Sequence, residues 1–115
     1  MQDFRTQLQK HEQFNRANKL IDAGDYKLSI QANEAAYCSP RRVLDDVYGY
    51  ESFEVVIKRF YGHNASVWVH PSSIEGLDEK FSELFCSEDN IGGYMRVKDI
   101  QELYEFLSIG AFKNE

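Results

Sequence analysis

Three segments with the residue patterns of β-strands constrain the fold most strongly. Residues 26–32 place Tyr, Leu, Ile and Ala at every second position, and residues 53–57 do the same with Phe, Val and Ile. This period of two is that of a half-buried strand. Residues 67–70 (Val-Trp-Val-His) are β-branched and aromatic, as strands prefer. Residues 61–64 (Tyr-Gly-His-Asn) predict a hairpin turn, so we expect consecutive strands to pair antiparallel.

Apolar residues at steps of three and four predict three amphipathic helices. The first has the stripe Phe4, Leu8, His11, Phe14, Ala17 and Ile21, and Gly24 is expected to end it. The second buries Leu77, Phe81, Leu84 and Phe85. A short strand at 94–97 precedes the last helix, which is expected to open with Asp99 and Glu102 as a capping box and to bury Ile100, Leu103, Tyr104 and Leu107.

The elements follow the order α-β-β-β-α-β-α and predict an α+β fold, a small antiparallel sheet with amphipathic helices packed on one face. The 115 residues are the size of one domain, so a single domain is expected over residues 1–115. The sequence has no run of about 18 apolar residues, so no membrane-spanning helix is expected. The first residues lack the apolar core of a signal peptide, and two cysteines fit a reducing compartment, so we expect a cytoplasmic protein.

Negative charge is concentrated in the last third of the chain. Residues 1–73 carry nine acids and nine bases, whereas residues 74–115 carry ten acids and four bases, so the net charge of −6 resides in the last 42 residues. A nucleic-acid-binding protein needs clustered Lys and Arg, so direct binding of nucleic acid is not expected. The asymmetry points instead to a partner of opposite charge.

The densest acidic segment, residues 75–89, has two interpretations. On the predicted helix, Glu75, Glu79 and Glu83 are each four residues from the next, and like charges at that spacing cost roughly 0.2–0.5 kcal/mol per pair. The first-turn acids favour the helix dipole, so a merely solvated face is one interpretation and a binding surface is the other. The candidate partner-binding residues are Glu75, Asp78, Glu79, Glu83, Glu88 and Asp89, with Tyr48 and Tyr50 in predicted loops as aromatic anchors.

The sequence offers no positive case for an enzyme. Cys38 with His63 or His70 lacks a nucleophile signature, and their convergence in space does not follow from their spacing. The same residues with Cys86 lack the close ligand pairs of a structural zinc site. We therefore expect no catalytic residue, cofactor or metal.

Four stretches resemble a group of small phage- and prophage-encoded orphan proteins: Ser-Ile-Gln-Ala at 29–32, Tyr-Cys-Ser-Pro-Arg at 37–41, residues 50–57, and Gly-Tyr-Met-Arg-Val-Lys-Asp-Ile at 93–100. Within that group, size, acidity and the lack of catalytic chemistry make the chain similar to an anti-CRISPR inhibitor of the type I-F surveillance complex. The resemblance implies a partner with a basic nucleic-acid-binding cleft, the Cas8f–Cas5f or Cas7f subunits, and a block of target DNA recognition. It carries over no binding residue.

Two other functions stay open at this stage. An acidic immunity protein or antitoxin that plugs the active site of a basic nuclease toxin relies on the same electrostatics. A small enzyme that uses Cys38 or the histidines belongs to a different class. The expected assembly is a monomer or a weak dimer, the latter through the stripe of the first predicted helix.

Overall fold

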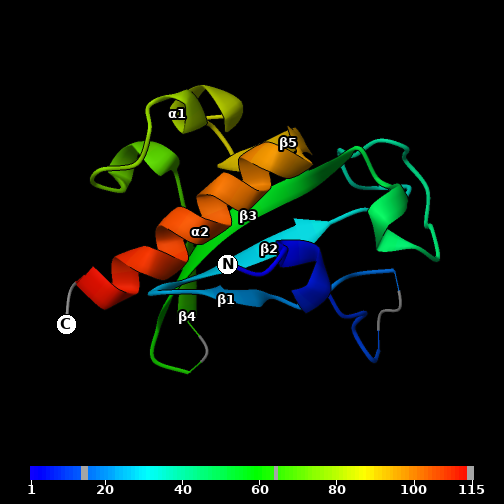
Figure 1. Ribbon diagram of the computed structural model, residues 1–115, viewed down its shortest axis with the longest axis horizontal. Helices are drawn as coiled ribbons and strands as arrows, with labels where there is room; N and C mark the ends of the chain where they lie inside the picture. Colours follow the sequence, from blue (N-terminus) through cyan, green and yellow to red (C-terminus); the bar gives the residue numbers. More distant parts are fainter. Residues whose placement is uncertain (14–15, 64, 114–115) are drawn as a thin grey trace.

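The computed structural model describes residues 1–13, 16–63 and 65–113, and within them five strands form one antiparallel sheet (Figure 1). The strands are β1 (Ile21–Ala23), β2 (Tyr26–Gln31), β3 (Ser52–Tyr61), β4 (Ala65–Val69) and β5 (Ile91–Arg96). The α-helices are α1 (Lys80–Leu84) and α2 (Val97–Lys113), and three 3₁₀ turns are η1 (Phe4–Gln7), η2 (Val47–Gly49) and η3 (Pro71–Ser73). The predicted α+β class and antiparallel sheet are confirmed.

Strand β3 organises the sheet because it is long enough to pair with three other strands. β2 runs along one edge of β3, and β4 and β5 share the other edge. β4 pairs with the half of β3 that ends at Tyr61, whereas β5 pairs with the half that begins at Ser52. The sheet order is therefore β1-β2-β3-β4, and β5 lies in line with β4 along the same edge of β3.

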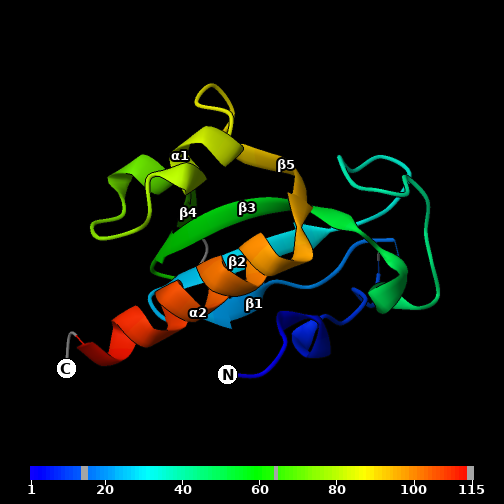
Figure 2. The same cartoon turned by 45° about the horizontal axis from the view of Figure 1, so that its top comes forward.

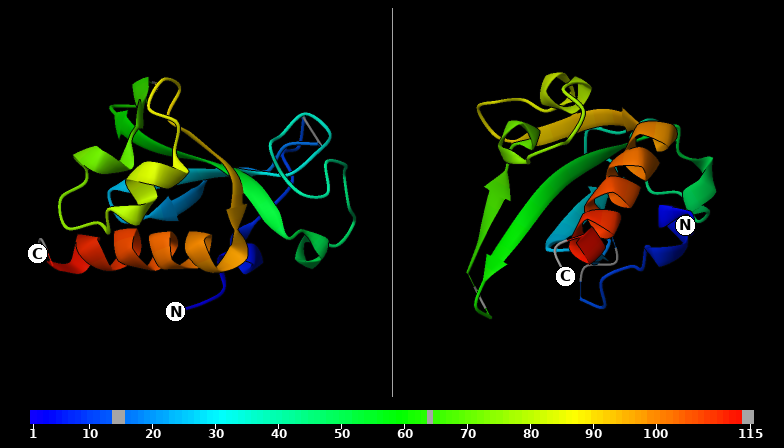
Figure 3. Two further views of the ribbon diagram at one scale, coloured as in Figure 1. Left: turned by 90° about the horizontal axis from the view of Figure 1, so that it is seen from above. Right: turned by 60° about the vertical axis from the view of Figure 1, so that its left-hand side comes forward.

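The pleat of the sheet separates a core face from an open face. Leu28, Ile57 and Val69 occupy one cross-strand row of the core face, and α2 lies along that face (Figure 3). The buried side of α2 consists of Ile100, Leu103, Tyr104 and Leu107, as its apolar stripe predicts. Phe53 and Phe81 are completely buried in the same core. Figure 2 shows α1 between η3 and β5, away from η2.

The prediction of a first amphipathic helix is wrong. Phe4 begins only a four-residue 3₁₀ turn, and Ile21 belongs to β1, whose partner in β2 is Leu28. Tertiary pairing thus overrides a weak helical pattern, and Phe14 of the predicted stripe lies outside the described residues. Gly24 does adopt the expected left-handed backbone (φ 65°), but it does so in the two-residue loop between β1 and β2.

The second and third predicted helices have different boundaries from those expected. α1 has only five residues, because the chain before it contains the η3 turn and Gly76 in a left-handed conformation (φ 83°). The helix still buries Phe81, and Phe85 is buried just beyond it, whereas Leu84 is exposed. α2 begins at Val97, so Asp99 lies inside the first turn and the predicted capping box is wrong.

Candidate functional site

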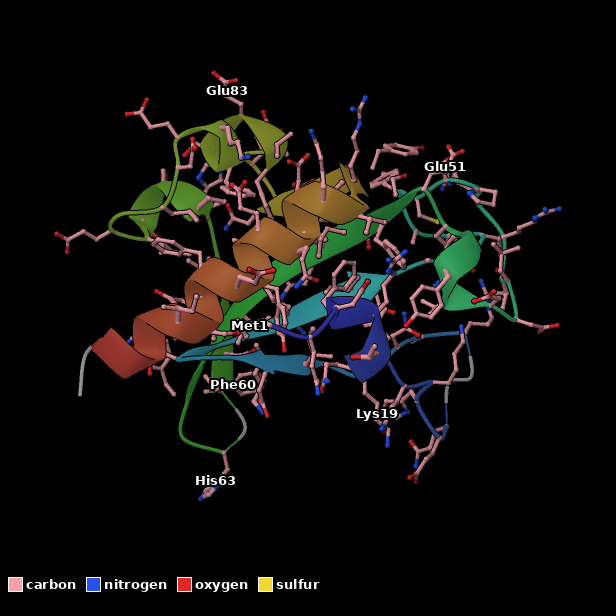
Figure 4. The ribbon with its side chains drawn as sticks, viewed as in Figure 1. Met1, Lys19, Glu51, Phe60, His63 and Glu83 are labelled. Atoms are coloured by element: carbon pink, nitrogen blue, oxygen red, sulfur yellow. The ribbon has the colours of Figure 1, made fainter. Side chains whose placement is uncertain are left out.

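Three of the predicted acidic residues line one surface hollow. Glu75 comes from the link between η3 and α1, Glu79 immediately precedes α1, and Glu83 lies within it. The hollow encloses about 490 Å³, and its floor includes Pro71 and Ile74. Figure 4 shows Glu83 projecting outward at this edge of the molecule. These three residues line one hollow although the predicted helix is absent over Glu75, because α1 packs against η3 and the link between them.

The one base of this segment, Lys80, is paired with carboxylates of α2 and does not line the hollow. Lys80 Nζ lies 2.8 Å from a carboxylate oxygen of Glu102 and 3.7 Å from one of Asp99. The hydrogen bond to Glu102 is the main reason why the pKa of Lys80 is raised. Lys80 is the only Lys or Arg between residues 75 and 89, so this segment keeps its acidic excess.

The other three predicted acids are exposed, and two of them accept a hydrogen bond from a nearby backbone N–H. The carboxylate of Asp78 accepts the backbone N–H of Lys80 at 2.9 Å, and that of Asp89 accepts the N–H of Ile91 at 3.0 Å. Glu88 is exposed in the loop between α1 and β5. Among the residues that the structure describes, none of the six candidate carboxylates forms an ion pair.

Trp68 is an aromatic candidate that the sequence reasoning missed. The side-chain amide of Asn90 donates to the carbonyl of Trp68 at 3.1 Å, which holds the loop of Glu88 and Asp89 against β4. The indole is 47% exposed on the open face of the sheet, with Lys58 Nζ 5.9 Å from its ring centroid. In the sequence, Trp68 follows β-branched Val67 and precedes Val69, which faces the core. Trp68 therefore occupies the face of the strand on which polar residues are expected, opposite Lys58.

The two tyrosines predicted as anchors do not lie together with the acids. Tyr50 is buried, and its hydroxyl donates to the carbonyl of Arg42 (2.7 Å) and accepts the N–H of Leu44 (2.7 Å). Burial is also the main reason why the pKa of Tyr50 is raised. Tyr50 is therefore a structural residue, and its prediction as an exposed anchor is wrong. Tyr48 of η2 is 51% exposed, but the guanidinium of Arg5, from η1, lies over its ring at 4.6 Å from the centroid. The η2 turn lies at the opposite end of the molecule from α1 (Figure 2).

The cysteines and histidines occupy separate places. Cys38 is fully buried, its thiol donates toward the carbonyl oxygens of Asn33 and Pro40, and its pKa is raised chiefly by burial. His70 precedes η3 and accepts the N–H of Ser72, whereas His63 projects from the turn after β3 (Figure 4).

Within the described ranges, no group of three His, Cys, Asp or Glu side chains is placed to hold a metal ion.

Comparison with known proteins adds no family: no protein-family model matches this chain, and no curated protein or solved structure matches it either. Within residues 1–13, 16–63 and 65–113, neither helix has the length and apolar character needed to cross a lipid bilayer.

Proposed function

We propose that this protein is an inhibitor that binds the basic nucleic-acid cleft of a protein partner through its acidic surface. The acidic surface is formed by Glu75, Asp78, Glu79, Glu83, Glu88 and Asp89. The observation that supports it best is the hollow lined by Glu75, Glu79 and Glu83, since the one base of this segment, Lys80, is paired with Glu102 of α2. From the sequence resemblance, the proposed partner is a type I-F CRISPR surveillance complex in the bacterial cytoplasm, at its Cas8f–Cas5f or Cas7f subunits.

Carboxylates without their own counter-ions suit this role for a physical reason. A cleft that holds a phosphate backbone presents Lys and Arg side chains, which are left without partners when the nucleic acid is absent. The acidic surface supplies negative charge to those side chains, raises the rate of encounter and excludes the nucleic acid by occupying its site. The chain needs no catalysis for such a role.

Charge at the rim of an interface contributes little to affinity, so a desolvated anchor is also required. Trp68 supplies it in this proposal, because the indole is half-exposed and the loop of Glu88 and Asp89 is hydrogen-bonded to its backbone through Asn90. Tryptophan is among the residues most enriched at the energetic centres of interfaces.

The test is binding of the purified protein to a purified, guide-loaded type I-F surveillance complex, followed by competition with target DNA. We expect a complex whose dissociation constant rises steeply between about 50 and 200 mM salt, and we expect bound protein to prevent DNA capture. Absence of binding at low salt would contradict the proposed partner. If the protein instead inhibits a basic nuclease and leaves the surveillance complex untouched, the immunity-protein alternative takes its place.

A further inference from the structure

Strand β4 is an edge of the sheet with no strand on its outer side. It pairs with β3, and within residues 1–13, 16–63 and 65–113 no other strand pairs with it. In the right-hand view of Figure 3, β4 (yellow-green) forms the outer border of the sheet. The four residues from Ala65 to Trp68 are all exposed. This edge is therefore open to a further strand.

The backbone groups of Ser66 and Trp68 face outward from the sheet. The carbonyl of Trp68 accepts the side-chain amide of Asn90 at 3.1 Å, and Asn90 belongs to the loop before β5 and not to β3. Backbone groups along a strand point alternately to either side, so those of Ser66, two residues earlier, point the same way as those of Trp68. Among the described residues, only Asn90 forms a hydrogen bond with these outward groups. Such a row of unpaired N–H and C=O groups is a template for pairing with another chain.

Strand β4 carries none of the features that usually protect an edge. Edge strands are commonly very short, charged, interrupted by proline or bulged. The sequence of β4, Ala-Ser-Val-Trp-Val, has no charge and no proline, and its register with β3 is regular. By contrast, β1 has only three residues with Asp22 at its centre, and the pairing of β5 is irregular between Phe53 and Val55. The regular, uncharged edge of β4 favours pairing with another strand.

The side chains of β4 are complementary to those of a second β4 that runs antiparallel to it. In a register centred on Val67, Val67 lies opposite itself, Ser66 opposite Trp68, and Ala65 opposite Val69. The larger side chains of Trp68 and Val69 thus face small ones, and the outward groups of Ser66 and Trp68 meet as a hydrogen-bonded pair. The carbonyl of Trp68 has a second lone pair for this bond, beside the one that the amide of Asn90 uses.

Charge does not oppose this arrangement. The bases of β3 beside β4 are Lys58 and Arg59, opposite Trp68 and Val67. Each is separated from its counterpart in the second copy by both β4 strands. Three strand spacings amount to about 14 Å, which exceeds the screening length of about 8 Å at physiological ionic strength. The like charges of these strands therefore do not meet.

We propose that two copies of this chain pair through their β4 strands, antiparallel about Val67, to form one continuous sheet across a two-fold axis. Such pairing uses the same surface on both copies and closes after two. The dimer predicted from the first helical stripe uses a different surface, and only the four-residue turn η1 exists there. The pairing uses the backbone edge of β4 and none of the carboxylates of the acidic surface, so its failure and that of the proposed function are distinguishable.

The test is the oligomeric state of the full chain. Five residue pairs make a small interface, so we expect a weak dimer with a dissociation constant on the order of 100 µM. Sedimentation equilibrium over about 10 µM to 1 mM measures this constant. A protein that stays monomeric throughout this range would overturn the proposal.

Proline at position 66 tests the use of the edge. The N–H of Ser66 points outward, so Ser66→Pro leaves the β3–β4 ladder intact. The variant should weaken the dimer by about 30-fold, because the two-fold axis doubles the loss of one hydrogen bond. Ser66→Ala keeps the N–H and is the control, with an expected dissociation constant within about two-fold of the wild-type value. Equal dimerisation of the proline and alanine variants would contradict pairing through β4.

Charge at position 67 tests the register. Val67 is 46% exposed, so a charged side chain there does not disturb the core of the monomer. Val67→Lys and Val67→Glu each place like charges directly opposite each other, so each variant alone should be monomeric over the same range. An equimolar mixture of the two should restore the dimer, because opposite charges then face each other.

Val43→Lys is the matched control for this charge change, since Val43 is a similarly exposed valine in a loop. It should dimerise like the wild-type protein. A mixture of the two Val67 variants that stays monomeric, or an equal loss of dimer in Val43→Lys, would overturn pairing about Val67.

Discussion

Lys80 and Glu102 join α1 to α2 through a contact of 2.8 Å between the ammonium and a carboxylate oxygen. The contact directs the one base of residues 75–89 away from the acidic hollow. Removing that base should leave Glu102 and Asp99 without their counter-ion and so make this end of the molecule more negative. The core should not be disturbed, because the side chains of Lys80 and Glu102 are about half-exposed.

We predict that Lys80→Gln speeds association with a partner that has a basic cleft and steepens the salt dependence of that rate. The thermal unfolding midpoint should change little, because exposed ion pairs contribute little to stability. Lys27→Gln is the matched control, since it removes a similarly exposed lysine that pairs with Asp22 in the β1–β2 hairpin. Stopped-flow mixing measures the rates, and equal acceleration by the two variants would refute a local role for Lys80.

Tyr50→Phe should destabilise the protein by about 1–3 kcal/mol, because it removes a buried hydroxyl and leaves the carbonyl of Arg42 and the N–H of Leu44 without their partner. Urea denaturation measures this change in the free energy of unfolding. Tyr48→Phe, at an exposed ring, should be nearly neutral. A neutral Tyr50→Phe variant would show that the hydroxyl does not hold the loop before η2.

The two thiols should differ sharply in reactivity. Cys86 is exposed, whereas Cys38 is fully buried and has a raised pKa, so little thiolate is available at neutral pH. In the native protein we expect a thiol reagent such as 5,5′-dithiobis(2-nitrobenzoic acid) to modify one cysteine quickly and the second only after denaturant is added. Fast modification of both would contradict the burial of Cys38.

Trp68→Ala should weaken partner binding by about 2 kcal/mol or more if the indole is the anchor of the acidic surface. The unfolding free energy should fall much less, because the ring is 47% exposed. Tyr48→Ala is the comparison, since it removes a similarly exposed ring from η2. Loss of binding in Tyr48→Ala together with full binding in Trp68→Ala would move the anchor to η2.

The strands were the most predictable part of the fold. Alternation at Leu28 and Ile30, and at Phe53 and Val55, reports burial on one face directly, and the structure buries all four. The stripe of α2 was equally readable, because each of its four apolar positions packs on the sheet.

The N-terminal segment was not predictable in this way. Phe4 and Ile21 do fall at helical spacing, but each is buried for a separate reason, Phe4 against Phe53 and Ile21 opposite Leu28 in the β1–β2 hairpin. The amide of Gln101 also accepts the N–H of Phe4 at 2.8 Å, a contact between residues 97 apart that no local pattern carries.

The acidic surface was predictable in composition and not in geometry. Sequence spacing identified Glu75, Glu79 and Glu83, but the helix on which that spacing relied covers only Glu83. The edge of β4 illustrates the opposite case, since the outward direction of the backbone groups of Ser66 and Trp68 depends on the pairing with β3. Only the tertiary structure shows that this edge has no neighbouring strand.

The most direct measurement compares two charge-reversal pairs in binding to the type I-F surveillance complex at low salt. Glu79→Lys with Glu83→Lys alters the acidic hollow, whereas Asp25→Lys with Asp45→Lys changes the net charge equally on exposed loops elsewhere. We predict that the first pair slows association by about 100-fold with a nearly unchanged unfolding midpoint, and that the second pair has a much smaller effect. Equal losses in the two pairs, or undiminished binding in the first, would contradict the assignment of this surface.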